Sequence, residues 1–153
     1  MTMNVATTTV PRNTIQKFKY PVFVGIGDTN MEQNVYWTNY FKWFGIAREI
    51  FLMSIFPDFL KLFSSGARII THETNIKHIS SAFFADEVIL ELWMTEVRKT
   101  SAKMMVNFVR KSTGEKIAEG WQMLVFADSQ GKPALIPPGL KKAVLKYVVD
   151  EVK

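Results

Sequence analysis

One segment constrains the fold more than any other, because residues 34–53 are apolar on almost every side of a helix. At about 100° per residue, only Thr38, Lys42 and Glu49 gather into a narrow polar stripe. A helix that is apolar all round is buried in a core rather than laid on a surface. Since about eighteen helical residues span roughly 27 Å, the rest of the chain must enclose a long central helix.

The segments around this helix have the alternation of strands. The strand-like runs cover residues 17–26, 67–80, 87–97, 103–110 and 116–127. A short helix or loop over 54–66 follows the long helix, and Pro137-Pro138-Gly139 precedes a final helix with Leu140, Val144 and Val148 on one face. Short turns between consecutive strands favour antiparallel pairing. This order predicts an α+β fold in which a five-stranded antiparallel sheet wraps around the long helix.

Length and composition limit the classes of function. The 153 residues correspond to one domain, with a disordered or loosely packed tail expected over 1–15 and the domain over 16–153. The absence of cysteine excludes disulfides, zinc–cysteine sites, iron–sulfur clusters and thiol catalysis. His72 and His78 are expected on one face of a single strand, as surface or edge residues, but their six-residue spacing is near 20 Å. We therefore expect no metal site.

The location and partners are constrained only weakly. No segment reaches the roughly 18 uninterrupted apolar residues that span a bilayer, and the N-terminus lacks the pattern of a secretory signal. We expect a cytoplasmic protein without membrane attachment. The basic residues are dispersed, which argues against nucleic-acid binding. No nucleotide-binding glycine motif is present, and we expect no cofactor.

One residue of the long helix and the loop that precedes it suggest a binding or catalytic site. Arg48 lies roughly 100° from the polar stripe, on an apolar side of the helix. A guanidinium keeps its proton, so Arg48 either reaches a carboxylate or water at the helix end, or it lines a pocket. The polar loop 28–34 runs into the start of the helix. Its residues are either caps, or they shelter backbone N–H groups that stabilise a developing oxyanion.

Three runs of residues carry a family resemblance. They are Val-Gly-Ile-Gly-Asp-Thr-Asn at 24–30, Asn-Val-Tyr-Trp-Thr-Asn-Tyr-Phe-Lys-Trp at 34–43 and Ala-Arg-Glu-Ile-Phe-Leu at 47–52. Together they resemble the hotdog-fold thioesterases of the 4-hydroxybenzoyl-CoA type, and among these the enediyne polyketide thioesterases more closely. The order of strands and helices extends the resemblance over the rest of the chain. It implies a hotdog fold and an enzyme that hydrolyses acyl thioesters.

The resemblance also implies particular site residues. In the broader family the third residue of an Asp-Thr-Asp motif is a carboxylate that acts as nucleophile or general base. Here that position is Asn30, whose amide cannot take up a proton at neutral pH. The enediyne group shares this departure, and its asparagine and helix arginine are the functional pair. Carried over, Asn30 would position the thioester carbonyl or the attacking water, and Arg48 would hold a β-keto or carboxylate oxygen.

The remaining site residues follow from the same resemblance. Backbone N–H groups of Asn34, Val35 and Tyr36 would form the oxyanion hole, with the side chains of Tyr36 and Glu49 lining the pocket.

One departure and one open question remain in this loop. Gln33 stands where the enediyne pattern has glycine, and its side chain would narrow the pocket mouth or alter the approach to the oxyanion hole. Asp28 and Glu32 are nearby carboxylates that could supply a base by another route, although a structural cap is the favoured role of Asp28.

The implied activity is release of a long polyketide or fatty acid, with a β-keto group, from an acyl carrier protein. The alternatives are an acyl-CoA thioesterase of lipid metabolism and a non-catalytic acyl-binding hotdog protein, the latter because Asn30 replaces the carboxylate. In this fold the active site is shared between subunits, which implies a homodimer or a dimer of dimers. The net charge of +5 would suit an acidic carrier protein or the phosphates of CoA.

Overall fold

The computed structural model describes residues 16–149, so the tail expected over 1–15 lies outside the described residues. The strands are β1 (Phe18–Phe23), β2 (Arg68–His78), β3 (Glu87–Thr95), β4 (Ser101–Arg110) and β5 (Lys116–Ala127). The helices are α1 (Trp37–Ile55), α2 (Phe59–Ser64) and α3 (Pro138–Val144), with 3₁₀ turns η1 (Ile26–Asp28) and η2 (Leu145–Tyr147). None of these helices is long and apolar enough to cross a membrane.

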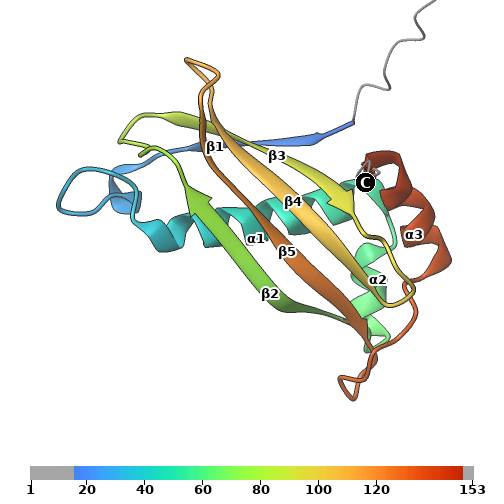
Figure 1. Cartoon of the computed structure of the whole chain (residues 1–153). Coiled ribbons are helices and arrows are strands. Elements are labelled where there is room, and N and C mark those ends of the chain that lie inside the picture. The colour runs from blue at the N-terminus through green and yellow to red at the C-terminus, as the bar shows by residue number, and fades with distance from the viewer. Residues whose placement is uncertain (1–15, 150–153) are drawn as a thin grey trace, which may run out of the picture.

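The five strands form one sheet in the order β1-β3-β4-β5-β2, and every neighbouring pair is antiparallel. The sheet curls across α1, with α2 and α3 near the far end of that helix (Figure 1). The sheet packs on α1 because apolar side chains alternate along its strands. Strands β3 and β4 bury every second residue against α1 and turn the others outward. The predicted α+β fold, with a five-stranded antiparallel sheet around a long helix, is confirmed.

The core lies between α1 and the inner face of the sheet. Its fully buried centre is formed by Phe44 and Phe51 of α1 with Leu90, Leu92, Met104, Val106 and Phe108 of β3 and β4. Burying a side chain of this size stabilises a fold by about 1.5–3 kcal/mol, so this contact fixes α1 on the sheet.

The structure corrects the predicted long helix at both its start and its surface. The helix begins at Trp37 rather than residue 34, because the N–H of Val35 donates to the carbonyl of Ala82 at 2.8 Å and that of Tyr36 to Asp28 at 2.9 Å. These bonds hold the preceding segment extended. The side of α1 away from the sheet is also exposed within one chain. Ile46 and Met53 are 37% and 40% exposed there, on the side of the predicted polar stripe.

Strand β2 lies at one edge of the sheet and contains a β-bulge. Thr71 pairs with Leu124, but Glu73 pairs with the next residue of β5, so one extra residue lies between them. Regular alternation would place Thr71 and His78 on opposite faces of the sheet. The bulge shifts the alternation by one residue, so His78 is turned toward α1 together with Thr71.

The final helix is shorter than predicted. Helix α3 ends at Val144 and continues as the 3₁₀ turn to Tyr147, whereas Val148 is extended and forms a parallel bridge with Met94 of β3.

Candidate active site

The loop between β1 and α1 closes on itself around Asn30. The Asn30 N–H donates to the carbonyl of Asn34 at 2.8 Å, and the Gln33 N–H donates to the carbonyl of Asn30 at 2.9 Å. The side-chain oxygen of Asn30 accepts the N–H of Glu32 at 2.9 Å. That oxygen is therefore committed to the loop. Within residues 16–149 the Asn30 Nδ2 has no acceptor, so its hydrogens remain available to a ligand.

The backbone conformation of this turn explains why the enediyne pattern has glycine where this chain has Gln33. Gln33 has a φ of 65°, in the left-handed region that favours glycine. The chain accommodates glutamine there at a cost of about 1 kcal/mol, and its side chain is exposed.

Asp28 has the structural role that the sequence favoured. Its Oδ2 accepts the N–H of Gly25 at 2.9 Å, and its carbonyl accepts the Nδ2 of Asn39 at 2.9 Å and the N–H of Tyr36. These bonds tie the loop to the first turn of α1.

The start of α1 supplies free backbone donors. The N–H groups of Val35 and Tyr36, which the resemblance placed in an oxyanion hole, are bonded within the chain. The first helical N–H groups, at Trp37 and Thr38, have no acceptor among the described residues. They form the positive end of the helix dipole.

A cavity of about 320 Å³ lies at this end of α1. It is lined by Asn30, Asn34, Val35, Tyr36, Trp37, Tyr40, His78, Ile79, Ser80 and Ser81. The structure thus brings four of the predicted site residues together, and we call this space the Asn30 cavity. It adds His78 and the serines, which the sequence did not assign to the site.

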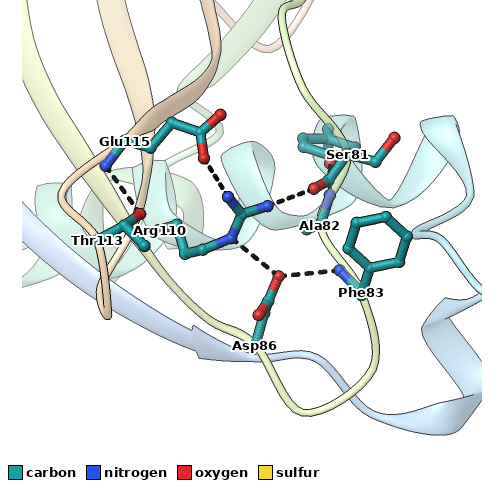
Figure 2. A network of polar contacts seen from close by, with 8 residues as sticks. Ser81, Ala82, Phe83, Asp86, Arg110, Thr113 and Glu115 are labelled. Carbon is teal, nitrogen blue, oxygen red and sulfur yellow. Dashed lines mark hydrogen bonds and ion pairs between the residues drawn. The ribbon is translucent and has the colours of Figure 1, made fainter.

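Arg110 holds one wall of the Asn30 cavity in place. Its guanidinium donates to the carbonyl of Ser81 at 2.5 Å, to Asp86 Oδ2 at 3.2 Å and to the carboxylate of Glu115 (Figure 2). Asp86 Oδ2 in turn accepts the N–H of Phe83 at 3.0 Å. Only 14% of the Arg110 side chain is exposed. The network fixes the β2–β3 loop against the end of β4.

Tyr40 connects this wall to α1. Its hydroxyl accepts the N–H of Ala82 at 3.3 Å, while the carbonyl of Ala82 accepts the N–H of Val35. Burial raises the pKa of the Tyr40 phenol, partly offset by its bond to Ala82 and by Arg110. The phenol is therefore neutral under physiological conditions. Its ring meets the His78 imidazole edge to face, with centroids 4.7 Å apart at 87°.

Arg48 lies in a different cavity. Its Nη1 donates to Thr71 Oγ1 at 2.8 Å and to Gln122 Oε1 at 3.2 Å, and its Nη2 lies 3.8 Å from the carboxylate of Glu49. The Arg48 side chain is only 16% exposed. Burial lowers the pKa of its guanidinium, and Glu49 acts in the opposite direction. Arg48 is thus a charged residue of α1 that hydrogen-bonds to the sheet, at Thr71 of β2 and Gln122 of β5.

The cavity beside Arg48 is mostly apolar. Its volume is about 320 Å³, and its lining residues are Arg48, Glu49, Leu52, Met53, Phe59, Leu60, Phe63 and Ile69. We call it the Arg48 cavity. Arg48 follows Trp37 by eleven residues, or roughly 16 Å along α1. A single chain therefore does not bring Asn30 and Arg48 to one reacting group.

A larger hollow, of about 520 Å³, lies on the face of the sheet turned away from α1. Trp93, Met105 and Trp121 form one cross-strand row there. The Nζ of Lys17 is 4.6 Å from the Trp93 ring centroid, and that of Lys103 is 4.8 Å from Trp121. This hollow contains none of the predicted residues and no helix N-terminus. Its size alone does not make it the candidate site.

The curled antiparallel sheet over one long helix is the hotdog fold. Residues 24–144 match the sequence profile of the thioesterase-like superfamily. The chain belongs to this superfamily, and the implied activity as a thioester hydrolase is confirmed at that level. A search of curated protein sequences gives no match.

Solved structures support the same fold. The dynemicin thioesterase superposes with a TM-score of 0.83 at 23% identity, covering 89% of this chain and 100% of that one. A gentisyl-coenzyme A thioesterase has a TM-score of 0.74 at 24% identity, covering 84% and 99%. The 1,4-dihydroxy-2-naphthoyl-CoA thioesterase of Synechocystis has a TM-score of 0.79 at 18% identity, covering 85% and 96%.

Proposed function

We propose that the protein hydrolyses long acyl or β-keto acyl thioesters, carried on an acyl carrier protein or on CoA, and releases the free acid. The observation that carries this proposal is the placement of two unpartnered donors at one cavity. Within the described part of the chain, Asn30, with its unpartnered side-chain Nδ2, and Trp37, with its unpartnered backbone N–H, both line the Asn30 cavity. Two donors beside a helix N-terminus suit the oxygen of a thioester carbonyl, where negative charge develops during attack.

The proposed reaction depends on electrostatic stabilisation. Water attacks the thioester carbon, and the carbonyl oxygen becomes an oxyanion held by Asn30 Nδ2 and the N–H of Trp37. Removal of one such donor typically lowers kcat by about 10²–10³-fold. The oxyanion donor is placed at Trp37 rather than at Val35 or Tyr36, since the N–H groups of those two residues are already bonded.

The proposed working unit is a homodimer, or a dimer of such dimers, with a site shared between subunits. Strand β2 is an edge strand whose residues 70–75 are exposed, and an exposed edge is a template for another strand. Arg48 is bonded to Thr71 on that strand. Antiparallel pairing of β2 with its copy reverses the strand direction. The Arg48 cavity of one subunit would then approach the Asn30 cavity of the other.

The exposed side of α1 supports the same assembly. Ile46 and Met53 are exposed apolar side chains on the outer side of α1, and a second subunit would cover them. Burial of α1 on all sides, which the sequence predicts, would then hold for the dimer.

The lining of the Arg48 cavity supports a long apolar substrate. Behind it, Leu52 and Ile69 also line an apolar cavity of only about 20 Å³. An acyl chain would occupy the Arg48 cavity, with Arg48 binding a β-keto oxygen. The dynemicin thioesterase binds a polyene. The gentisyl and dihydroxynaphthoyl relatives act on CoA thioesters of aromatic acids.

Thiol release tests the proposal directly. Palmitoyl-CoA, a β-keto acyl-CoA of similar length and benzoyl-CoA are compared with the same acyl groups on an acyl carrier protein. We expect hydrolysis of the long chains to exceed that of benzoyl-CoA, and a preference for the carrier that disappears at high salt. Binding of a fluorescent acyl chain without thiol release from any substrate would support the non-catalytic alternative instead.

A further inference from the structure

We propose that His78 is the general base that activates the attacking water in the Asn30 cavity. This inference rests on the proposed thioesterase function and adds the group that takes up the proton.

The first argument is the chemistry of the residues that line the cavity. Asn30 has no proton-accepting group at neutral pH, and its side-chain oxygen is already bonded to the Glu32 N–H. The Tyr40 phenol is neutral because burial raises its pKa. Among the lining residues, His78 alone has an imidazole, the side chain that most often serves as a general acid or base. It is therefore the lining residue suited to proton transfer.

The nearby carboxylates do not replace it. Asp28 bonds to the Gly25 N–H and does not line the cavity. Glu32 is exposed and outside the lining. Glu49 lines the Arg48 cavity, more than three helical turns along α1 from Trp37.

The position of His78 in the Asn30 cavity suits the same role. The bulge in β2 turns His78 toward α1, where its imidazole meets the Tyr40 ring edge to face. The imidazole is exposed at the rim of the cavity, so water reaches it. Asn30 and the start of α1 line the same space.

The charged and titratable groups around His78 come from three elements. Tyr40 faces it from α1, with the Arg110–Asp86 pair behind the phenol, and Tyr36 lines the cavity from the loop. On β5 its partner is Ala118, and the neighbouring Lys116 and Glu119 bond to each other. None of these groups forms an ion pair with the imidazole.

Neutral His78 takes one proton from water while the water oxygen bonds to the thioester carbon. The tetrahedral oxyanion is held by Asn30 and Trp37. The carbon–sulfur bond then breaks, and the imidazolium returns the proton to the leaving thiolate. The products are the free acid and the thiol of CoA or the carrier.

The test compares His78→Gln with Lys77→Gln, using wild-type protein and palmitoyl-CoA or its carrier thioester. Lys77 is the control because it is an exposed neighbour on the same strand, outside residues 70–75 and outside the lining of the Asn30 cavity. We expect His78→Gln to lower kcat by about 100-fold or more with KM within twofold. Lys77→Gln should match wild type. Wild-type kcat should fall on the acid side of neutrality, and His78→Gln should lose that dependence.

A rescue experiment separates chemistry from structure. Imidazole added to His78→Ala should restore a substantial part of kcat in a concentration-dependent way, which a merely structural role would not produce. Equal kcat and pH profile for His78→Gln and wild type, or no rescue of an inactive His78→Ala, overturns the assignment while leaving the thioesterase function intact. Absence of thiol release by wild type on every substrate overturns the function itself, and this inference with it.

Discussion

Nη1 of Arg48 donates to Oγ1 of Thr71 at 2.8 Å, and this bond joins the central helix to the edge strand of the sheet. The guanidinium is held where the Arg48 cavity meets the edge proposed to pair with a second subunit. Thr71 pairs with Leu124 and faces inward in the regular part of β2, ahead of the bulge.

Thr71→Val should lower the free energy of unfolding by about 1–2 kcal/mol, since a hydrogen bond to a charged group is lost while the side-chain shape is kept. Urea denaturation measures the difference. Thr74→Val is the matched control, because its hydroxyl bond to the carbonyl of Trp121 is long, at 3.4 Å. We expect less than about 0.5 kcal/mol for that control. Equal effects of the two substitutions would show that the Arg48 bond contributes nothing.

Arg110→Met should destabilise the protein by about 2–3 kcal/mol, because the Asp86 carboxylate and the Ser81 carbonyl lose their part-buried partner. The loop that lines the Asn30 cavity should loosen, so kcat should also fall. Thermal unfolding and thiol release measure the two effects. The neighbouring Lys111→Met removes only an exposed pair with Glu87 and should change stability by less than about 0.5 kcal/mol.

Gln33→Gly should stabilise the protein by about 1 kcal/mol, because the left-handed φ of 65° disfavours side chains. Differential scanning calorimetry gives the shift in Tm. Gln130→Gly serves as the control, since Gln130 lies in an exposed turn and is not among the non-glycine residues with positive φ. Loss of stability in both variants would show that the turn around Asn30 is not strained.

The raised pKa of Tyr40 predicts that the free energy of unfolding depends on pH in alkaline solution. Its pKa is raised in the folded protein, so the fold binds the phenolic proton more tightly than the unfolded chain. The free energy of unfolding should therefore fall as pH rises above about 10. Tyr40→Phe should lack this part of the decrease, after losing about 1 kcal/mol at neutral pH with the Ala82 bond. Parallel pH curves for the two proteins would contradict the shift.

Much of the fold could be predicted from the sequence, because alternation and helical periodicity are local. The apolar pattern of α1 and the strand β5 over 116–127 are examples. The residue at which α1 begins could not be predicted from the sequence, because it depends on a hydrogen bond from Val35 to Ala82, which are far apart in the chain.

The candidate site was predicted only in part. The loop residues around Asn30 do line one cavity. The separation of Arg48 from Asn30 within one chain depends on the packing of α1 against the sheet. His78 was missed because a bulge, which leaves no clear signal in the residue types, decides which face it occupies. The Asn30 and Arg48 roles stay predictions.

The most direct test is the hydrolysis rate of a long-chain acyl thioester by wild type, Asn30→Ala and Arg48→Ala, with Asn107→Ala, on the outer face of β4, as the control. We predict measurable hydrolysis by wild type and by the control. Asn30→Ala should have a kcat about 10²–10³-fold lower, and Arg48→Ala should weaken turnover of β-keto substrates most. Unchanged hydrolysis by both Asn30→Ala and Arg48→Ala would contradict the assignment of the active site.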